Sequence, residues 1–188
     1  MGLLGRLAGM LPIYLRIAWW GLVSPRAVES EPLLVVQGVV RDDDRVLLSV
    51  RSDLHGWEIP GGTPHRGEDD LEAIRRELFE ETGLEVAVER HVGDYVRSGF
   101  RPHTARIFLC RVTGGALQPS VETPKLGWFD IDHLPDTLFP WYRAPLEDAF
   151  ACRPEPVERH EHQGGAAVWS GMKIDLRMRL SDDAAGRP

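Results

Sequence analysis

One segment, residues 68–82, constrains the fold and the chemistry of this chain more than any other. The spacing predicts a helix from about Glu68 to Thr82, with acidic residues at its positively polarised N-terminus and Gly83 at its C-terminal end. Three carboxylates share one arc of about 100° on the helical wheel: Glu77, Glu80 and Glu81. The apolar positions form a separate stripe that predicts packing against a sheet: Leu71, Ile74 and Leu78.

Carboxylates that are clustered in this way need an explanation. Like charges at positions i,i+3 and i,i+4 destabilise a helix unless a cation neutralises them. Carboxylate oxygens are the ligands that Mg²⁺ and Mn²⁺ prefer in proteins. The spacing alone leaves two interpretations open, a metal site or a solvated acidic face.

A wider pattern surrounds these carboxylates. Its fixed positions are Gly62, five residues, Glu68, seven residues, Arg76-Glu77-Leu78, one residue, Glu80-Glu81, one residue, and Gly83-Leu84. With average residue usage, nine such positions match by accident roughly once in a billion starting points. The pattern resembles the Nudix box, and the preceding segment 57–62 resembles the approach to it. The chain is therefore identified as a member of the Nudix hydrolase family, at motif level over 57–84 and at pattern level over about 33–150.

The predicted fold is α/β. Residues 33–40 and 46–50 are read as strands joined by an acidic turn, and further strands are expected at 86–92, 95–99, 105–112 and 128–131. A last helix is expected at 141–150. Strands and helices interleave, which favours a mixed sheet covered by helices. The resemblance implies the Nudix fold, an α/β/α sandwich with a loop–helix–loop catalytic motif.

The resemblance also implies a metal site for Mg²⁺, with Mn²⁺ as an alternative. Its implied ligands are the carbonyl of Gly61 and the carboxylates of Glu77, Glu80, Glu81 and Glu122, where Glu77 or Glu122 could instead act as the base. Arg76 would pair with a box carboxylate and hold it in position, and Glu68 would be a supporting acid. Gly62 would let the backbone approach the metal. The metals would activate a water that attacks phosphorus.

The implied reaction is cleavage of a nucleoside diphosphate linked to another group (NDP-X), such as a nucleotide sugar or an ADP-ribose-like compound. Expected substrate contacts are Arg51, Arg101, His103 and Phe100, and Tyr95, Phe100 or Trp141 is a candidate for stacking on a base. Three alternatives stay open. They are a nucleoside triphosphate pyrophosphatase, a catalytically inactive ligand-sensing module, and an isomerase that would need a catalytic cysteine.

Charge and cysteine content limit the partners. Acidic residues outnumber Lys and Arg by 29 to 22, giving a net charge of −7, which argues against non-specific nucleic-acid binding. A phosphate substrate therefore needs a cation or local arginines. The two cysteines, Cys110 and Cys152, are too few for a disulfide framework, so both are predicted to be buried, reduced thiols in a cytoplasmic protein.

The two ends of the chain lie outside the resemblance. Residues 1–29 are read as an apolar helical arm that packs on its own domain or on a partner chain in a homodimer. A membrane-surface anchor or a signal are alternatives, but no stable membrane insertion is expected because Arg6, Pro12 and Arg16 interrupt the segment. Residues 30–150 form the predicted Nudix domain. Residues 151–188 are expected to contain an exposed linker at 155–163 and an edge strand at 172–180, where apolar and charged residues alternate.

Overall fold

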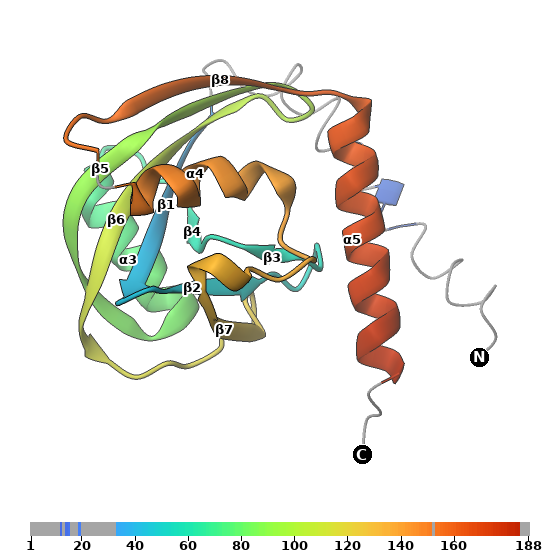
Figure 1. Cartoon of the computed structure of the whole chain (residues 1–188), viewed down its shortest axis with the longest axis horizontal. Helices are drawn as coiled ribbons and strands as arrows, with labels where there is room; N and C mark the ends of the chain where they lie inside the picture. Colours follow the sequence, from blue (N-terminus) through green and yellow to red (C-terminus); the bar gives the residue numbers. More distant parts are fainter. Residues whose placement is uncertain (1–11, 13, 16–18, 20–32, 152, 185–188) are drawn as a thin grey trace.

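The computed structural model describes residues 12, 14, 15, 19, 33–151 and 153–184. Figure 1 shows a curved sheet with helices on both sides and a long helix beside it. The strands are β1 (Leu33–Asp42), β2 (Arg45–Val50), β3 (Trp57–Glu58), β4 (Gly61–Gly62), β5 (Leu84–Gly99), β6 (His103–Gly115), β7 (Lys125–Asp130) and β8 (Val157–Gln163). The helices are α3 (Asp70–Thr82), α4 (Arg143–Phe150) and α5 (Gly165–Ala184), with short 3₁₀ turns at Ile131–His133 and Pro140–Tyr142.

The sheet is mixed, as predicted. Its strand order is β3-β2-β1-β6-β5-β8, while β4 pairs with β1 and β7 pairs with β2. The β1–β6 and β5–β8 pairs are parallel and the other pairs are antiparallel. The strands expected at 86–92 and 95–99 are one continuous strand, β5, whose pairing with β6 shifts register at three irregular positions. Such bulges let a long strand bend without ending.

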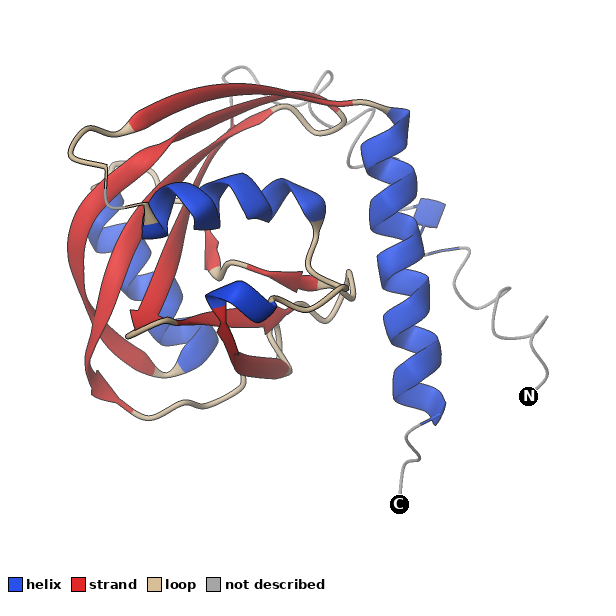
Figure 2. Ribbon diagram, in the orientation of Figure 1, coloured by secondary structure: helices blue, strands red, loops and turns tan. Residues whose placement is uncertain are grey.

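Apolar side chains cover both faces of the sheet. A helix lies against each face (Figure 2). On one face, Ile74 and Leu78 of α3 pack with Leu47 of β2. On the other face, Leu146 of α4 lies in one cluster with Leu48. Adjacent residues of β2 thus point into opposite cores, as the two-residue period of a strand requires. The α/β/α sandwich is confirmed.

Helix α3 begins and ends with clear capping interactions. The Asp69 side chain accepts a hydrogen bond from the backbone N–H of Leu71, which satisfies one free donor of the first turn. Gly83 adopts a left-handed φ of 72° at the C-terminal end, as the sequence predicts. The helix starts two residues later than expected, because Asp69 serves as the cap.

The prediction for the C-terminal region was wrong in two places. The expected linker at 155–163 contains the edge strand β8, which pairs with β5, and the expected strand at 172–180 lies inside helix α5. Alternating residues suggested a strand, but the buried positions Gly171, Asp175 and Met178 follow helical spacing. Asp175, assigned by the alternation to a solvated face, is completely buried.

The predicted N-terminal arm falls mostly outside the described residues. Of its members, Pro12, Tyr14, Leu15 and Trp19 are helical. None of the helices in the described part of the chain is both long and apolar enough to cross a membrane. Cys110 is a buried free thiol, as predicted, and Cys152 lies outside the described residues.

Candidate active site

Glu81 is the most deeply buried of the three helix carboxylates. Only 8% of the residue is exposed, and its Oε2 accepts a hydrogen bond from the backbone N–H of Gly61 at 2.9 Å. Burial raises the pKa of Glu81 to about 8, and the negative charge of Glu58 adds to this effect. The positive charge of Arg51 opposes this rise of the pKa but is too weak to cancel it.

Glu77 lies against the backbone of the Gly61–Gly62 strand. A side-chain carbon added at Gly62 would lie 2.4 Å from Glu77 Oε2, so only glycine leaves room for the carboxylate here. Gly61 has a φ of 146°, and a side-chain carbon there would lie 2.2 Å from the carbonyl oxygen of Val36. Partial burial raises the pKa of Glu77 as well, although Arg76 opposes the shift.

Arg76 connects the carboxylates of this region. Its Nε and Nη2 each donate to an oxygen of Glu68 at 2.8 Å, a bidentate pair, and its Nη1 lies 2.9 Å from Glu77 Oε1 and 3.2 Å from Glu80 Oε2. The Glu80 side chain is 58% exposed and contacts the same guanidinium as Glu77 does. The expected pairing of Arg76 with box carboxylates is therefore present.

An acidic cavity of about 360 Å³ lies between α3, the segments 51–53 and 61–63 before it, and the loop before β7. It is lined by Arg51, Ser52, Asp53, Gly61, Gly62, Thr63, Glu77, Glu81 and Glu122. Of the predicted metal ligands, four line this cavity, whereas Glu80 lies outside its lining. Within the described residues, no three His, Cys, Asp or Glu side chains stand close enough together to hold a metal ion as they are placed.

Glu122 reaches the cavity from the loop before β7. The Ser120 hydroxyl accepts a hydrogen bond from the backbone N–H of Glu122, and the carbonyl of Glu122 accepts one from Ser52 N–H at 2.8 Å. The neighbouring Thr123 hydroxyl donates to the carbonyl of Glu81 at 2.6 Å. This loop is thus fixed to the C-terminal turn of α3, which brings two segments 41 residues apart to one cavity.

These residues suit a divalent cation. All of the predicted donors are carboxylate or carbonyl oxygens, the ligand type of Mg²⁺ and Mn²⁺. Glu81 is a buried carboxylate whose ionised form is unfavourable in the surroundings described here, and a cation in the cavity would remove that penalty. The close approach at Gly62 gives the carboxylate of Glu77 a fixed place beside the backbone.

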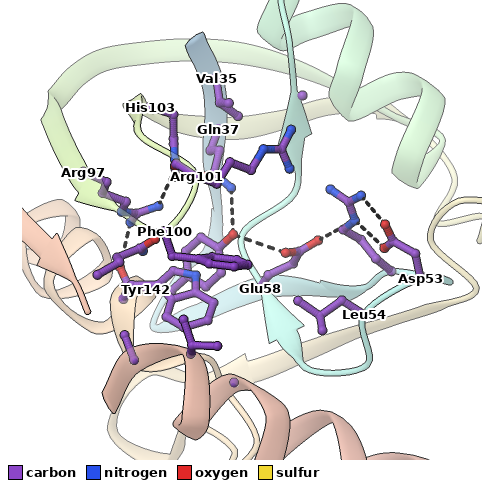
Figure 3. A pocket seen from close by; sticks show the side chains of 18 of the residues that line it. Val35, Gln37, Asp53, Leu54, Glu58, Arg97, Phe100, Arg101, His103 and Tyr142 are labelled. Carbon is purple, nitrogen blue, oxygen red and sulfur yellow. Dashed lines mark hydrogen bonds and ion pairs between the residues drawn. The ribbon is translucent and has the colours of Figure 1, made fainter. Parts of the chain in front are cut away.

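A larger pocket of about 520 Å³ adjoins the acidic cavity and shares Arg51, Asp53 and the segment 61–63 with it. Four predicted substrate-contact residues all line this pocket: Arg51, Phe100, Arg101 and His103. The last three are labelled in Figure 3. Trp141 lines the pocket as well. Tyr95 does not, because it is fully buried and its hydroxyl donates to Asp148. The stacking role considered for Tyr95 was therefore wrong.

The predicted contact residues already have partners within the protein. Arg51 donates through Nε and Nη2 to both oxygens of Asp53, at 2.9 and 2.8 Å. His103 Nδ1 lies 2.7 Å from the carbonyl of Arg101, so Nδ1 carries the hydrogen and Nε2 faces Arg97. Burial lowers the pKa of His103 to about 4, so this imidazole is neutral near pH 7.

Sequence reasoning missed a polar network in the pocket. The Tyr142 hydroxyl donates to Glu58 Oε2 and accepts from Gln37 Nε2, both at 3.2 Å, while Glu58 Oε1 lies 3.9 Å from Arg51 Nε (Figure 3). Burial raises the pKa of Glu58 to about 7, although Arg51 opposes the shift. Glu58 sits within the 57–62 segment that was identified, but the other members lie on strands and turns whose proximity the sequence did not indicate.

Comparison with known proteins decides the family. The model of the NUDIX domain matches residues 32–149. The chain belongs to the NUDIX family. A MutT-like protein from Streptomyces ambofaciens is 33% identical to it over 141 residues, which cover 73% of this chain and 91% of the relative. This Nudix protein is also 32% identical over 114 residues to an ADP-ribose pyrophosphatase of Methanocaldococcus jannaschii, covering 57% of this chain and 68% of that enzyme.

Solved structures agree with this assignment. The crystal structure of an ADP-ribose pyrophosphatase from Streptococcus suis superposes with a TM-score of 0.57 at 27% identity, covering 70% of this chain and all of that one. A MutT Nudix hydrolase from Burkholderia pseudomallei gives a TM-score of 0.55 at 26% identity, covering 63% of this chain and 98% of that one. The present chain is thus a Nudix hydrolase, an enzyme of the pyrophosphohydrolase class.

Proposed function

We propose that this Nudix hydrolase is a Mg²⁺-dependent enzyme that cleaves NDP-X compounds, with nucleotide sugars or ADP-ribose-like molecules as the substrate class. The observation that carries the proposal is the junction of the two cavities. The acidic cavity offers oxygen ligands, the larger pocket offers aromatic and apolar surface, and Arg51 lines both. A diphosphate at this junction would place its phosphorus beside the carboxylates and its organic group in the larger pocket. The ADP-ribose pyrophosphatases among the relatives support this class.

The proposed roles follow from the positions of the residues. Bound Mg²⁺ would supply charge neutralisation and a more acidic water, and its ligands would be Glu77, Glu81, Glu122 and the Gly61 carbonyl, with Glu80 at the outer edge. Arg76 orients Glu77 and Glu80 through its guanidinium. Arg51 binds a substrate phosphate after exchanging its contact with Asp53. Glu77 or Glu122 accepts the proton of the attacking water.

Two alternative functions have less support, a ligand-sensing module and an isomerase. A ligand-sensing module without catalysis is disfavoured because the box glutamates are all present. An isomerase needs an accessible thiol, and Cys110, the one cysteine among the described residues, is fully buried in the core beside α3 and lines neither cavity. A nucleoside triphosphate pyrophosphatase remains the competing proposal, and a relative named RNA pyrophosphohydrolase is a reason to include RNA among the substrates tested.

The test is a screen of the full chain with Mg²⁺ or with chelator in which the nucleoside monophosphate product is measured by chromatography, because cleavage of an NDP-X compound gives two phosphorylated products and no free phosphate. Its substrates are nucleotide sugars, ADP-ribose, dinucleotides, nucleoside triphosphates and triphosphate-ended RNA. The proposal expects Mg²⁺-dependent turnover that is fastest on an NDP-X compound and that falls by several orders of magnitude in Glu81→Gln. Preference for triphosphates would favour the competing activity, and near-normal turnover of Glu81→Gln would refute the assigned role of the box.

We further propose that the enzyme is a cytoplasmic homodimer assembled through its N-terminal arm. The apolar composition of residues 1–29 supports this, as do the exposed side chains of Leu15 and Trp19. Removal of residues 1–24 is expected to reduce the molar mass in light scattering from a dimer to a monomer. An unchanged molar mass would exclude the arm from assembly.

A further inference from the structure

Helix α5 forms one wall of the larger pocket. Four of its residues line the pocket, and they recur on one face of the helix: Ala167, Val168, Gly171 and Met172. None of the four lines the acidic cavity. The helix begins at Gly165, beyond the residues 32–149 that match the NUDIX domain, and stands beside the sheet in Figure 1. This wall thus lies outside the segment that matches the family model.

A buried carboxylate fastens α5 to the loop that follows β2. Asp175 is completely buried, and its Oδ1 accepts a hydrogen bond from the backbone N–H of His55 at 2.7 Å. Arg179 Nε lies 2.9 Å from both oxygens of Asp175, and Arg179 Nη2 donates to the carbonyl of Asp53 at 2.9 Å. The Tyr14 hydroxyl donates to Oδ2 of the same carboxylate at 2.7 Å. We call Asp175 and Arg179 the clasp.

The clasp therefore connects two parts of the pocket. One end holds α5, and the other holds residues 53–55, which begin two residues after Arg51 along the chain. Burial of a carboxylate costs free energy unless the group is paired and hydrogen-bonded. The arrangement that keeps these contacts of Asp175 is therefore the favourable geometry of the clasp. That geometry sets how far α5 stands from the opposite side of the pocket.

The surface that α5 presents is apolar and closely fitted. Trp141 stacks on Phe139 with ring centroids 4.8 Å apart and an angle of 7° between the planes, which fixes its orientation. A side-chain carbon at Gly171 would lie 3.1 Å from Trp141 Cη2, so the helix packs directly on this ring. Val168 and Met172 continue the wall. A flat or apolar group fits such a surface, whereas a diphosphate does not.

We propose that α5 is the specificity-determining wall of this enzyme, that it contacts the base or other organic group of the substrate, and that Asp175 is the positioning residue that holds it in place. The inference rests on the proposed cleavage of NDP-X compounds and adds to it the element that recognises the non-reacting half. Binding energy from this half lowers KM without changing the chemical step if it is equal in the ground and transition states.

The experiment compares three variants of the full chain. Val168→Trp fills the pocket from α5, Asp175→Asn loosens the clasp, and Trp169→Ala changes a neighbouring side chain that is 59% exposed and lies outside the pocket lining. The measurements are kcat and KM on ADP-ribose and UDP-glucose, together with inhibition constants for ADP and for inorganic pyrophosphate. Pyrophosphate has no organic group, so it reports on the acidic cavity alone. Thermal melting identifies variants that do not fold.

The proposal predicts a split between the two inhibitors. Val168→Trp raises KM for the preferred substrate and the inhibition constant of ADP about tenfold or more, equivalent to about 1.4 kcal/mol, while the constant for pyrophosphate changes less than about twofold. Asp175→Asn raises KM by a similar factor and leaves kcat within about threefold, because the chemistry at α3 is untouched. Trp169→Ala behaves as the wild type does.

Three results would overturn the inference. Equal changes in the ADP and pyrophosphate constants of Val168→Trp would mean that α5 does not contact the organic group. A lower melting temperature of Asp175→Asn with unchanged KM would make the clasp merely structural. If the wild type hydrolyses no diphosphate compound, the proposed function fails first. Calorimetric titration with ADP and pyrophosphate in Mg²⁺ then still decides whether α5 lines a nucleoside site.

Discussion

Replacement of Glu81 by Gln should stabilise the metal-free protein while it impairs the enzyme. The pKa of Glu81 is about 8 in the folded chain and 4.5 for an unperturbed glutamate. Between these values the folded state keeps a proton that the unfolded chain releases, so folding becomes less favourable as pH rises through this window. Gln has nearly the same shape and carries no proton to lose.

The size of the effect follows from the same two pKa values. Ionisation of Glu81 stabilises the unfolded chain and so lowers the free energy of unfolding. At 1.36 kcal/mol per pKa unit, this decrease is about 3 kcal/mol at pH 7 and less than about 1 kcal/mol at pH 5. Glu81→Gln should therefore raise the free energy of unfolding by about 3 kcal/mol at pH 7 and by much less at pH 5.

Urea unfolding in the presence of EDTA, followed by tryptophan fluorescence at both pH values, measures this difference. Glu80→Gln is the matched control, because the Glu80 side chain is 58% exposed and pairs only at the surface with Arg76. It should change the free energy of unfolding by less than about 1 kcal/mol at either pH. A stabilisation by Glu81→Gln that is absent, or equal at pH 5 and pH 7, would refute the reasoning.

Three further predictions concern single side chains. Gly62→Ala should lower kcat about a hundredfold, because the new methyl group would displace Glu77 and a small displacement of a catalytic group slows the reaction strongly. An unchanged kcat would show that the close approach of Glu77 to Gly62 is unimportant for catalysis. Arg51→Ala should raise KM more than it lowers kcat in steady-state assays, and an unaltered KM would remove Arg51 from substrate binding. Asp148→Asn should lower the free energy of unfolding by about 2 kcal/mol at pH 7, since it breaks the bidentate contact with Arg159. That contact lowers the pKa of Asp148, so it stabilises the fold above the ordinary aspartate pKa and ceases to do so in acid. The difference in the free energy of unfolding between the wild type and the variant should therefore shrink below about pH 4. A deficit that is constant with pH would contradict this.

The sequence predicted the parts of the molecule whose physics is local. The terminating Gly83 of helix α3 and the buried positions Ile74 and Leu78 were predicted from the sequence. The cap at Asp69 was not, and Leu71, which was assigned to the same apolar stripe, is 39% exposed. The mixed sheet followed from interleaved apolar runs. The position of Glu122 was predicted by family resemblance, while its hydrogen bonds to residues of two other segments could not be.

The failures have a common physical cause. In α5, apolar side chains lie at every second position by coincidence, while the face that packs on the domain contains the charged residue Asp175. A buried carboxylate satisfied by His55, Arg179 and Tyr14 is invisible to a hydropathy pattern, because two of its partners, His55 and Tyr14, come from distant segments. The network of Glu58 and Tyr142 was missed for the same reason.

The proposed activity requires that the carboxylates of α3 and the Gly61–Gly62 backbone form a divalent-cation site. Titration of metal-free protein with Mn²⁺, followed by the loss of the free-ion signal in electron paramagnetic resonance, tests this directly. The wild type should bind Mn²⁺ with competition from Mg²⁺, and a folded Glu77→Gln/Glu81→Gln variant should bind at least about tenfold more weakly, since a buried ligand pair is lost. Equal Mn²⁺ affinity in the two proteins would contradict the account.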